Sequence, residues 1–207
     1  MDRAARIAVV GAGLGGLSAA GFLQRAGFAV RVFEQAPAFS RIGAGIILSA
    51  NATKVLRRLG LERALVEAGI KSQRYISRAW DTGETLYEMV FDAHSEQHFG
   101  GPYVHIHRGD LHAVLERAVA PGTIAFDHQL VDLEETSDAV RLVFANGTKT
   151  EADIVIGADG IRSKVREFVI DDEPPQFAGA AAYRAIFPAE RLRGFKIPDC
   201  TKWWGRD

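Results

Sequence analysis

The chain has 207 residues, of which 47% are hydrophobic, so it can bury a full core without help from a metal or a disulfide. Its 25 Lys and Arg residues nearly balance its 26 Asp and Glu residues, and the net charge of −1 excludes an overall field that would attract nucleic acid or an anionic membrane. One cysteine, no leader-like start and no apolar run near the roughly 20 residues that cross a bilayer together predict a soluble, cytoplasmic protein without internal disulfides.

The start of the chain predicts a strand, a helix and a second strand in that order. Residues 6–10 form a short apolar run that ends at a glycine-rich loop, and residues 17–25 repeat apolar side chains at helical spacing. Gly27 is suited to end this helix, and residues 29–34 are rich in β-branched and aromatic side chains. This order indicates a βαβ unit.

Helices and antiparallel hairpins alternate along the rest of the chain. After a loop at 41–45, apolar spacing predicts a helix over 51–66 with a break at Gly60, and another helix over 110–119. The predicted hairpins pair residues 75–80 with 86–91 and residues 140–144 with 154–156, the second around Asn146-Gly147. Further strands are predicted over 124–130 and 177–187.

The loop after the first strand carries the clearest chemical signal. Gly11, Gly13 and Gly16 fit the pattern in which one glycine permits a tight turn, the next admits a pyrophosphate, and the last lets helix and strand pack closely. The N-terminus of the following helix offers N–H groups and partial positive charge to the phosphates. Glu34, at the end of the second strand, can accept hydrogen bonds from a ribose and would repel a 2′-phosphate. The loop therefore predicts a site for the ADP part of NAD or FAD.

Three more motifs follow this loop in order. They are Arg-Ile-Gly-Ala-Gly at 41–45, His-Arg-Gly-Asp-Leu at 107–111 and the Gly-Ala-Asp-Gly turn at 157–160. With the glycine loop they resemble the FAD-dependent aromatic hydroxylases, single-component flavin monooxygenases such as salicylate, hydroxybenzoate and hydroxynicotinate hydroxylases. The resemblance covers almost the whole chain. It implies FAD as cofactor, NADH or NADPH as co-substrate, and hydroxylation of a small aromatic acid by O2 through a flavin hydroperoxide.

The resemblance also implies cofactor-binding residues. They are Gly11, Gly13, Gly15 and Gly16 for the pyrophosphate, Glu34 and Gln35 for the adenosine ribose, Leu130 for the adenine, Arg41 and Ile47 for the flavin side, Arg108 for the FAD phosphates or ribityl chain, and Asp159 for the region shared by FAD and the nicotinamide nucleotide. Two of these have structural alternatives. Arg108 could be a surface ion-pair partner, and Asp159 could be an ordinary turn residue.

A carboxylate substrate needs a basic or hydrogen-bonding anchor, and the predicted strand at 180–187 offers Tyr183 and Arg184 as candidates. No catalytic residue is assigned, because the cofactor performs the oxygen chemistry. Some relatives have a histidine where this chain has Ile47, so no base is assigned there either. The histidines lack the context of a metal site, and no metal is expected.

The implied fold is α/β: a Rossmann-like FAD-binding fold with an inserted antiparallel β substrate layer, incomplete at its C-terminal end. The predicted parts are a βαβ unit and helix over 1–73, a hairpin insertion over 74–102, a continued FAD-binding domain over 103–172, and the start of a substrate domain over 173–207. The family chains continue further, and no element follows Trp203 and Trp204 to cover them. We therefore expect a truncated chain whose ADP-binding half forms while the flavin site stays open.

Two other functions remain open. An NAD-dependent dehydrogenase would use the same glycine loop and Glu34, but it gives no reason for the turn at 157–160 or the Arg41 motif. A non-catalytic fragment that binds FAD or another nucleotide is the second alternative. The aromatic ring, the choice between NADH and NADPH, and the oligomeric state are all left open by the sequence.

Overall fold

A computed structural model describes residues 5–41, 43–170, 173–197 and 200–206 of the chain. The chain divides into two compact units, Met1–Arg41 with His112–Ala181 and Ile42–Leu111 with Ala182–Asp207. The second unit therefore joins the hairpin insertion to neighbouring segments that the sequence analysis grouped with the FAD-binding part.

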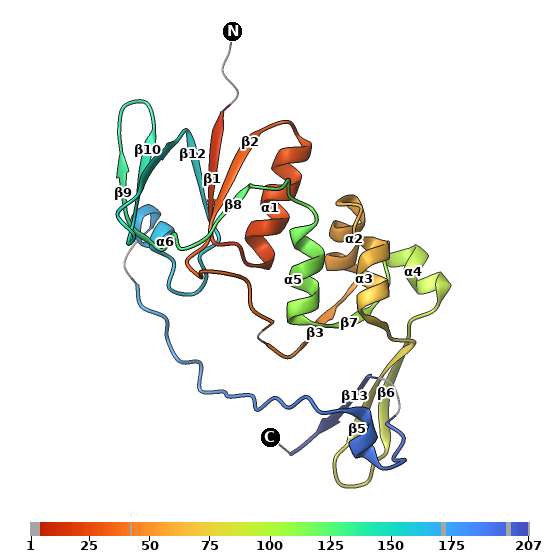
Figure 1. Cartoon of the computed structure of the whole chain (residues 1–207). Helices are drawn as coiled ribbons and strands as arrows, with labels where there is room; N and C mark the ends of the chain where they lie inside the picture. Colours follow the sequence, from red (N-terminus) through yellow and green to blue (C-terminus); the bar gives the residue numbers. More distant parts are fainter. Residues whose placement is uncertain (1–4, 42, 171–172, 198–199, 207) are drawn as a thin grey trace. The chain divides into compact units, whose positions relative to one another are not determined.

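A four-stranded parallel sheet in the order β12-β1-β2-β8 forms the centre of the first unit (Figure 1). Its strands are β1 (Arg6–Val10), β2 (Ala29–Phe33), β8 (Ile124–Ala125) and β12 (Ile154–Gly157). Helix α1 (Leu14–Arg25) connects β1 to β2 and contacts both strands. The predicted βαβ unit is confirmed.

A second layer of the first unit covers one face of this sheet. Antiparallel strands β9 (Leu130–Glu135), β10 (Val140–Phe144) and β11 (Lys149–Ala152) are ordered β11-β10-β9, and helix α6 (Lys164–Val169) follows β12. Side chains at alternate positions of β1 meet those of β10 in one core, in which the rings of Phe33 and Phe144 lie 4.8 Å apart. Because side chains alternate across a strand, the opposite face of β1 is left for α1.

One predicted strand pairing and one predicted strand length in the first unit are wrong. The partner of β10 across Asn146-Gly147 is β11, whereas residues 154–156 pair in parallel with β1. The Asp153 carboxylate accepts bonds from the Arg6 backbone N–H at 2.7 Å and the Arg6 guanidinium at 2.7 Å, which ties this segment to β1. The predicted strand over 124–130 stops at Ala125, since Asp127 adopts a φ of 56° and turns the chain before β9.

The second unit contains two three-stranded sheets. One orders β3 (Gly45–Leu48), β7 (Val104–His107) and β4 (Ile70–Lys71) as β3-β7-β4, and the other orders β13 (Cys200–Trp204), β5 (Arg74–Ala79) and β6 (Thr85–Val90) as β13-β5-β6. The antiparallel pairing of β5 with β6 confirms the first predicted hairpin. Strand β3 lies where the sequence predicted only a loop.

Four helices accompany these sheets: α2 (Ala50–Arg58), α3 (Glu62–Ala68), α4 (Ala93–Phe99) and α5 (Arg108–Glu116). The predicted break at Gly60 is confirmed, with a φ of 69° between α2 and α3. Helix α4, which the sequence analysis did not predict, is capped by the Asp92 carboxylate, which accepts the Ser95 N–H at 2.8 Å. Helix α5 begins in the second unit and ends in the first.

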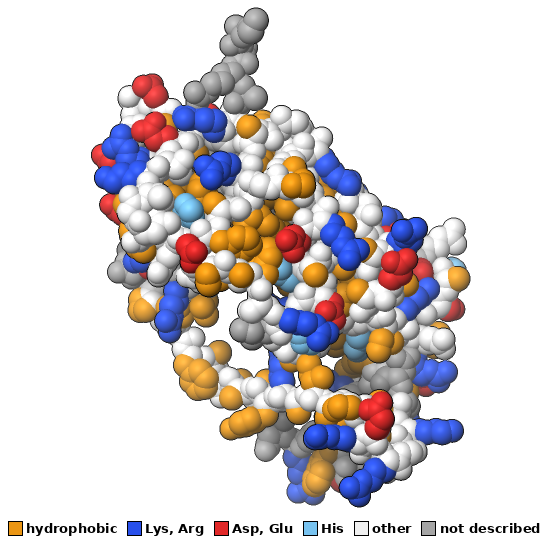
Figure 2. Space-filling model, in the orientation of Figure 1, with side chains coloured by type: hydrophobic (Ala, Val, Ile, Leu, Met, Phe, Trp, Pro, Cys, Tyr) orange, Lys and Arg blue, Asp and Glu red, His pale blue; other side chains and the backbone are white. Residues whose placement is uncertain are grey.

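The predicted strand over 177–187 is wrong. Residues 173–188 contain no helix or strand, and the short 3₁₀ helix η1 (Ala189–Leu192) follows them. Their hydrophobic side chains stand at the surface (Figure 2), with Phe177 82% exposed. Among the described residues no strand pairs with this segment, so its backbone N–H and C=O groups lack the ladder partners that a strand requires.

Among the described residues, no helix combines the length and hydrophobicity that crossing a membrane requires.

Candidate functional site

Two glycines shape the loop between β1 and α1. Gly11 has a φ of +97°, and a Cβ there would lie 2.3 Å from the Ala158 carbonyl oxygen. A Cβ on Gly16 would lie 1.9 Å from the Gly11 carbonyl oxygen. Both positions therefore require glycine for packing alone, as the sequence pattern predicts for the tight turn and the close helix contact.

The other two loop glycines have open space around them. A Cβ on Gly13 or Gly15 would meet nothing within 4 Å. Gly13 is the N-cap of α1 in an extended conformation that other residues adopt, so the fold itself does not require glycine there. The first-turn N–H groups of a helix have no partner within the helix, and a 12-residue helix concentrates positive potential at that end. Open space at such an end fits a pyrophosphate.

Glu34 contacts this loop from the end of β2. Its Oε2 accepts the Ala12 N–H at 2.8 Å, and its Oε1 accepts the Ala36 N–H at 2.9 Å. Each carboxylate oxygen has a second lone pair, so the group can still accept bonds from a ribose. Gln35, the other predicted ribose residue, is exposed beside it.

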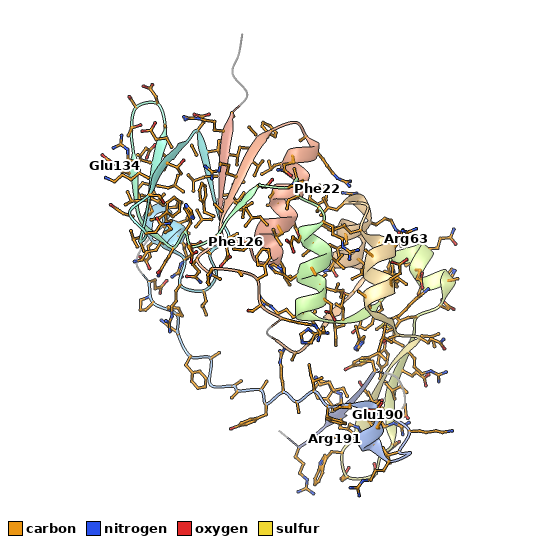
Figure 3. The ribbon with its side chains drawn as sticks, viewed as in Figure 1. Phe22, Arg63, Phe126, Glu134, Glu190 and Arg191 are labelled. Atoms are coloured by element: carbon orange, nitrogen blue, oxygen red, sulfur yellow. The ribbon has the colours of Figure 1, made fainter. Side chains whose placement is uncertain are left out.

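His112 of α5 holds the same loop and was not predicted as a site residue. Its Nε2 donates to the Ala12 carbonyl oxygen at 2.7 Å. The ring lies edge-on to Phe39 with centroids 4.1 Å apart, and Phe39 in turn packs edge-on against Phe126, labelled in Figure 3. His112 lies 100 residues from Ala12 in the sequence, so no local pattern indicates this contact.

A cavity of about 410 Å³ lies beside the carboxyl ends of β1 and β2. It is lined by Val10, Gly11, Phe33, Gln35, His128, Gln129, Leu130, Asp159, Arg162 and Lys164. Four of these residues were predicted from the sequence, and the cationic Arg162 and Lys164 were not. A larger cavity of about 790 Å³, next to Arg6 and Arg141, contains no predicted site residue. Because carboxyl strand ends are where α/β sheets bind ligands, the smaller cavity is the candidate site.

Asp159 has a structural role at the edge of this cavity. Its carboxylate accepts the Ser163 hydroxyl at 2.5 Å and the Lys164 N–H at 2.7 Å, which stabilises the start of α6. The preceding carbonyl, that of Ala158, lies against Gly11. The glycine loop and the turn at 157–160 are thus in contact within the first unit.

The other two motifs meet within the second unit. The Arg108 N–H donates to the Ala44 carbonyl oxygen at 3.0 Å, and the His107 Nε2 donates to the Gly43 carbonyl oxygen at 3.0 Å. Ile47, in the neighbouring part of β3, is 48% exposed. The Arg108 side chain is exposed at the start of α5, and Arg41, the last residue before this unit, is also exposed. The four motifs therefore form two pairs, one in each unit.

The two substrate candidates lie on the irregular segment before η1. Tyr183 and Arg184 are exposed. Their predicted strand does not form, and the structure supplies no geometry for a substrate anchor at these residues.

Comparisons with known proteins agree with this arrangement. Residues 4–174 match the family described as FAD binding domain. The chain is 44% identical to a 6-hydroxynicotinate 3-monooxygenase of Pseudomonas fluorescens, over 100% of this chain and 54% of that protein. It is 40% identical to a 3-amino-4-hydroxybenzoate 2-monooxygenase of Streptomyces cremeus, over 99% of this chain and 52% of that protein.

Among solved structures, HpxO of Klebsiella pneumoniae complexed with FAD and uric acid resembles the fold with a TM-score of 0.70 and 27% identity. The match covers 80% of this chain and 41% of that one. The chain thus spans about half the length of the curated relatives it matches.

Proposed function

The chain belongs to the family of FAD-binding domains, and from this premise we propose that it is the FAD-binding part of a monooxygenase that hydroxylates a small aromatic acid with NADH or NADPH. The observation that carries the proposal is the open space at Gly13, the N-cap of α1, next to Ala12, whose N–H donates to the Glu34 carboxylate. The names of relatives that act on hydroxynicotinate and hydroxybenzoates support the substrate class.

FAD would be held by groups from several elements. The loop N–H groups would bind the pyrophosphate, Glu34 and Gln35 the adenosine ribose, and the Leu130 backbone the adenine in the cavity of about 410 Å³. We keep Arg41 and Ile47 as proposed contacts of the flavin side, Arg108 as a proposed contact of the FAD phosphates or ribityl chain, and Asp159 as a residue near both nucleotides.

One unpredicted cation extends this proposal. Arg162 lines the cavity that also contains Gly11, so its positive charge would favour a diphosphate there, whereas the Lys164 ammonium is paired with the Glu167 carboxylate at 2.5 Å. Surface charges act weakly in water, and their contribution should fall as salt rises.

When bound, FAD supplies the redox chemistry that activates O2 and transfers oxygen to the ring. The residues of this chain bind and orient the ADP end of the cofactor. The Glu34 carboxylate also holds the Ala12 N–H, so one group would both recognise the ribose and shape the phosphate loop.

Replacing Glu34 tests the cofactor assignment. Glu34→Arg should weaken FAD binding by about 100-fold, because it removes charged hydrogen bonds to the ribose and to the loop. The matched control is Glu190→Arg, which makes the same change on the exposed η1 and should bind FAD like the unaltered chain. Titration of flavin fluorescence measures both. Unchanged binding by Glu34→Arg would refute the ribose assignment.

A comparison of cofactors separates the proposal from a dehydrogenase. The purified chain should bind FAD and become yellow, and NAD at the same concentration should not displace the FAD. Tight NAD binding with no flavin binding would favour the dehydrogenase instead.

The hydroxylase activity requires its own test. Stimulation of NADH or NADPH oxidation by 6-hydroxynicotinate or a hydroxybenzoate, with formation of a hydroxylated product, would show that the FAD-loaded chain is sufficient for the reaction. Flavin binding without stimulation by any of these acids would favour a non-catalytic FAD-binding fragment.

A further inference from the structure

The two peptide bonds on either side of Ala12 are each held by a side chain from another element. The Ala12 N–H donates to Glu34 Oε2 at 2.8 Å, and the Ala12 carbonyl accepts from His112 Nε2 at 2.7 Å. The two side chains come from the end of β2 and from α5. The phosphate loop is therefore fixed from two sides.

Because a peptide group is planar, each of these hydrogen bonds also fixes the orientation of the group at the other end of the same peptide bond. In a planar trans peptide, the carbonyl and the following N–H point in opposite directions. A hydrogen bond from His112 to the Ala12 carbonyl thus orients the Gly13 N–H away from the histidine. In the same way Glu34 orients the Gly11 carbonyl, the group that lies against Gly16.

We infer that His112 is a positioning residue for the bound diphosphate, acting through the Ala12 carbonyl to aim the Gly13 N–H. The inference rests on the proposed function, because it takes the group beside Gly13 to be the pyrophosphate of FAD. A Cβ on Gly13 would meet no atom within 4 Å, so packing on that side of Gly13 does not restrain the peptide plane.

The histidine is well placed to restrain the loop. Its neighbours Leu111, Val114 and Leu115 are 2–3% exposed, so α5 is anchored along its buried face. The ring is half-buried and lies edge-on to Phe39 at 4.1 Å between centroids. Since a carbonyl oxygen only accepts, Nε2 carries the proton, and any replacement must donate from a similar position to keep the bond.

A restrained loop favours binding because less conformational freedom is lost when the ligand arrives. Without the His112 bond, the Ala12–Gly13 peptide can rotate toward other orientations that glycine readily adopts. One hydrogen bond of this kind corresponds to about a tenfold change in an equilibrium constant.

Paired replacements of His112 test the inference in the full chain. His112→Phe keeps a ring beside Phe39 but cannot donate, and we expect it to weaken FAD binding by about tenfold. His112→Gln retains an N–H donor and should restore most of the affinity. His94→Phe makes the same chemical change on the exposed α4 and should bind FAD like the unaltered chain.

Flavin-fluorescence titration gives the affinities, and thermal unfolding without FAD reports whether each variant folds. If His112→Phe does not fold, His112→Leu, which also lacks a donor and is close to histidine in volume, replaces it. Rescue by glutamine supports the positioning role. Equal affinity of the phenylalanine, glutamine and unaltered chains would overturn it.

Amide exchange gives a second measurement that needs no FAD. Loss of the His112 bond should accelerate exchange of the Ala12 N–H, measured by NMR, by about tenfold, because both bonds hold the same residue. An unchanged exchange rate of the Ala12 N–H in His112→Phe would refute the inference that His112 restrains the loop. If even the unaltered chain does not bind FAD, the proposed function fails, while the exchange rate still decides whether His112 restrains the loop.

Discussion

At the scale of single residues, the loop contains two kinds of glycine. The fold requires Gly11 and Gly16, whereas we propose that the ligand requires Gly13. Gly16→Ala would put a methyl group 1.9 Å from the Gly11 carbonyl oxygen, a backbone atom that cannot move aside. We expect this change to lower the free energy of unfolding by about 3 kcal/mol. Urea denaturation followed by circular dichroism measures it, and a loss below 1 kcal/mol would contradict the close packing of α1 on the loop.

Gly13→Ala should behave in the opposite way. The added methyl group meets no protein atom within 4 Å, so the free energy of unfolding should fall by less than about 1 kcal/mol. The methyl group would occupy the space proposed for the pyrophosphate, and FAD binding should weaken by at least about tenfold. The same two assays check this prediction. Normal FAD affinity in Gly13→Ala would mean that the pyrophosphate lies elsewhere.

At the scale of elements, the cap of α4 makes a pH-dependent prediction. The backbone N–H of Ser95 holds the pKa of the Asp92 carboxyl below its usual value. A carboxyl with a lowered folded pKa stabilises the fold fully above the unfolded value of about 3.9, and this stabilisation is lost as pH falls through the folded value. In NMR titrations the Ser95 amide shift should therefore follow a midpoint below 3.9.

Asp92→Asn is the control for that titration. Asparagine caps helices about as well as aspartate but does not titrate, so the change in the Ser95 amide shift should disappear in this variant. A Ser95 shift that follows the same titration in both chains would show that another group causes it.

Local patterns predicted most elements, because periodicity and turn residues act within a few positions. They predicted β1, α1 and β2, the hairpin of β5 with β6, and the break at Gly60. Local patterns did not predict correctly which strands pair with one another. The apolar run at 154–156 fits a hairpin with β10 equally well, but β11 takes that edge, and the run pairs with β1 beside the distant ion pair of Asp153 with Arg6.

In the candidate site, too, some residues could be predicted from local sequence patterns and others could not. The glycines and Glu34 belong to one continuous motif, so the sequence could predict that they meet. His112 reaches the loop across 100 residues, and Arg162 and Lys164 line the cavity only because β12 lies beside β1. Tertiary contacts of this kind leave no periodic signal in the sequence.

At the scale of the whole molecule, the irregular segment over 173–188 is the most accessible part of the described chain for a protease. Arg184 is its one basic residue, and the segment is exposed throughout. Brief trypsin treatment should therefore cut after Arg184 before it cuts within the sheets, giving fragments 1–184 and 185–207 by mass spectrometry. Arg184→Gln should delay the first cut, and early cleavage after Arg78 of β5 instead would contradict the pairing of that strand.

The order of strands in the parallel sheet also determines when the phosphate loop can be completed during translation. Strand β1 is made before its partner β12, which follows 147 residues later, as the pairing of Ile7 with Ile154 requires. At the usual rate of elongation this gap lasts about 7 to 30 s. Throughout it, the Ala158 carbonyl that lies against Gly11 does not yet exist. A growing chain therefore cannot complete its phosphate loop early, and FAD can assist folding only after nearly the whole of the first unit has left the ribosome.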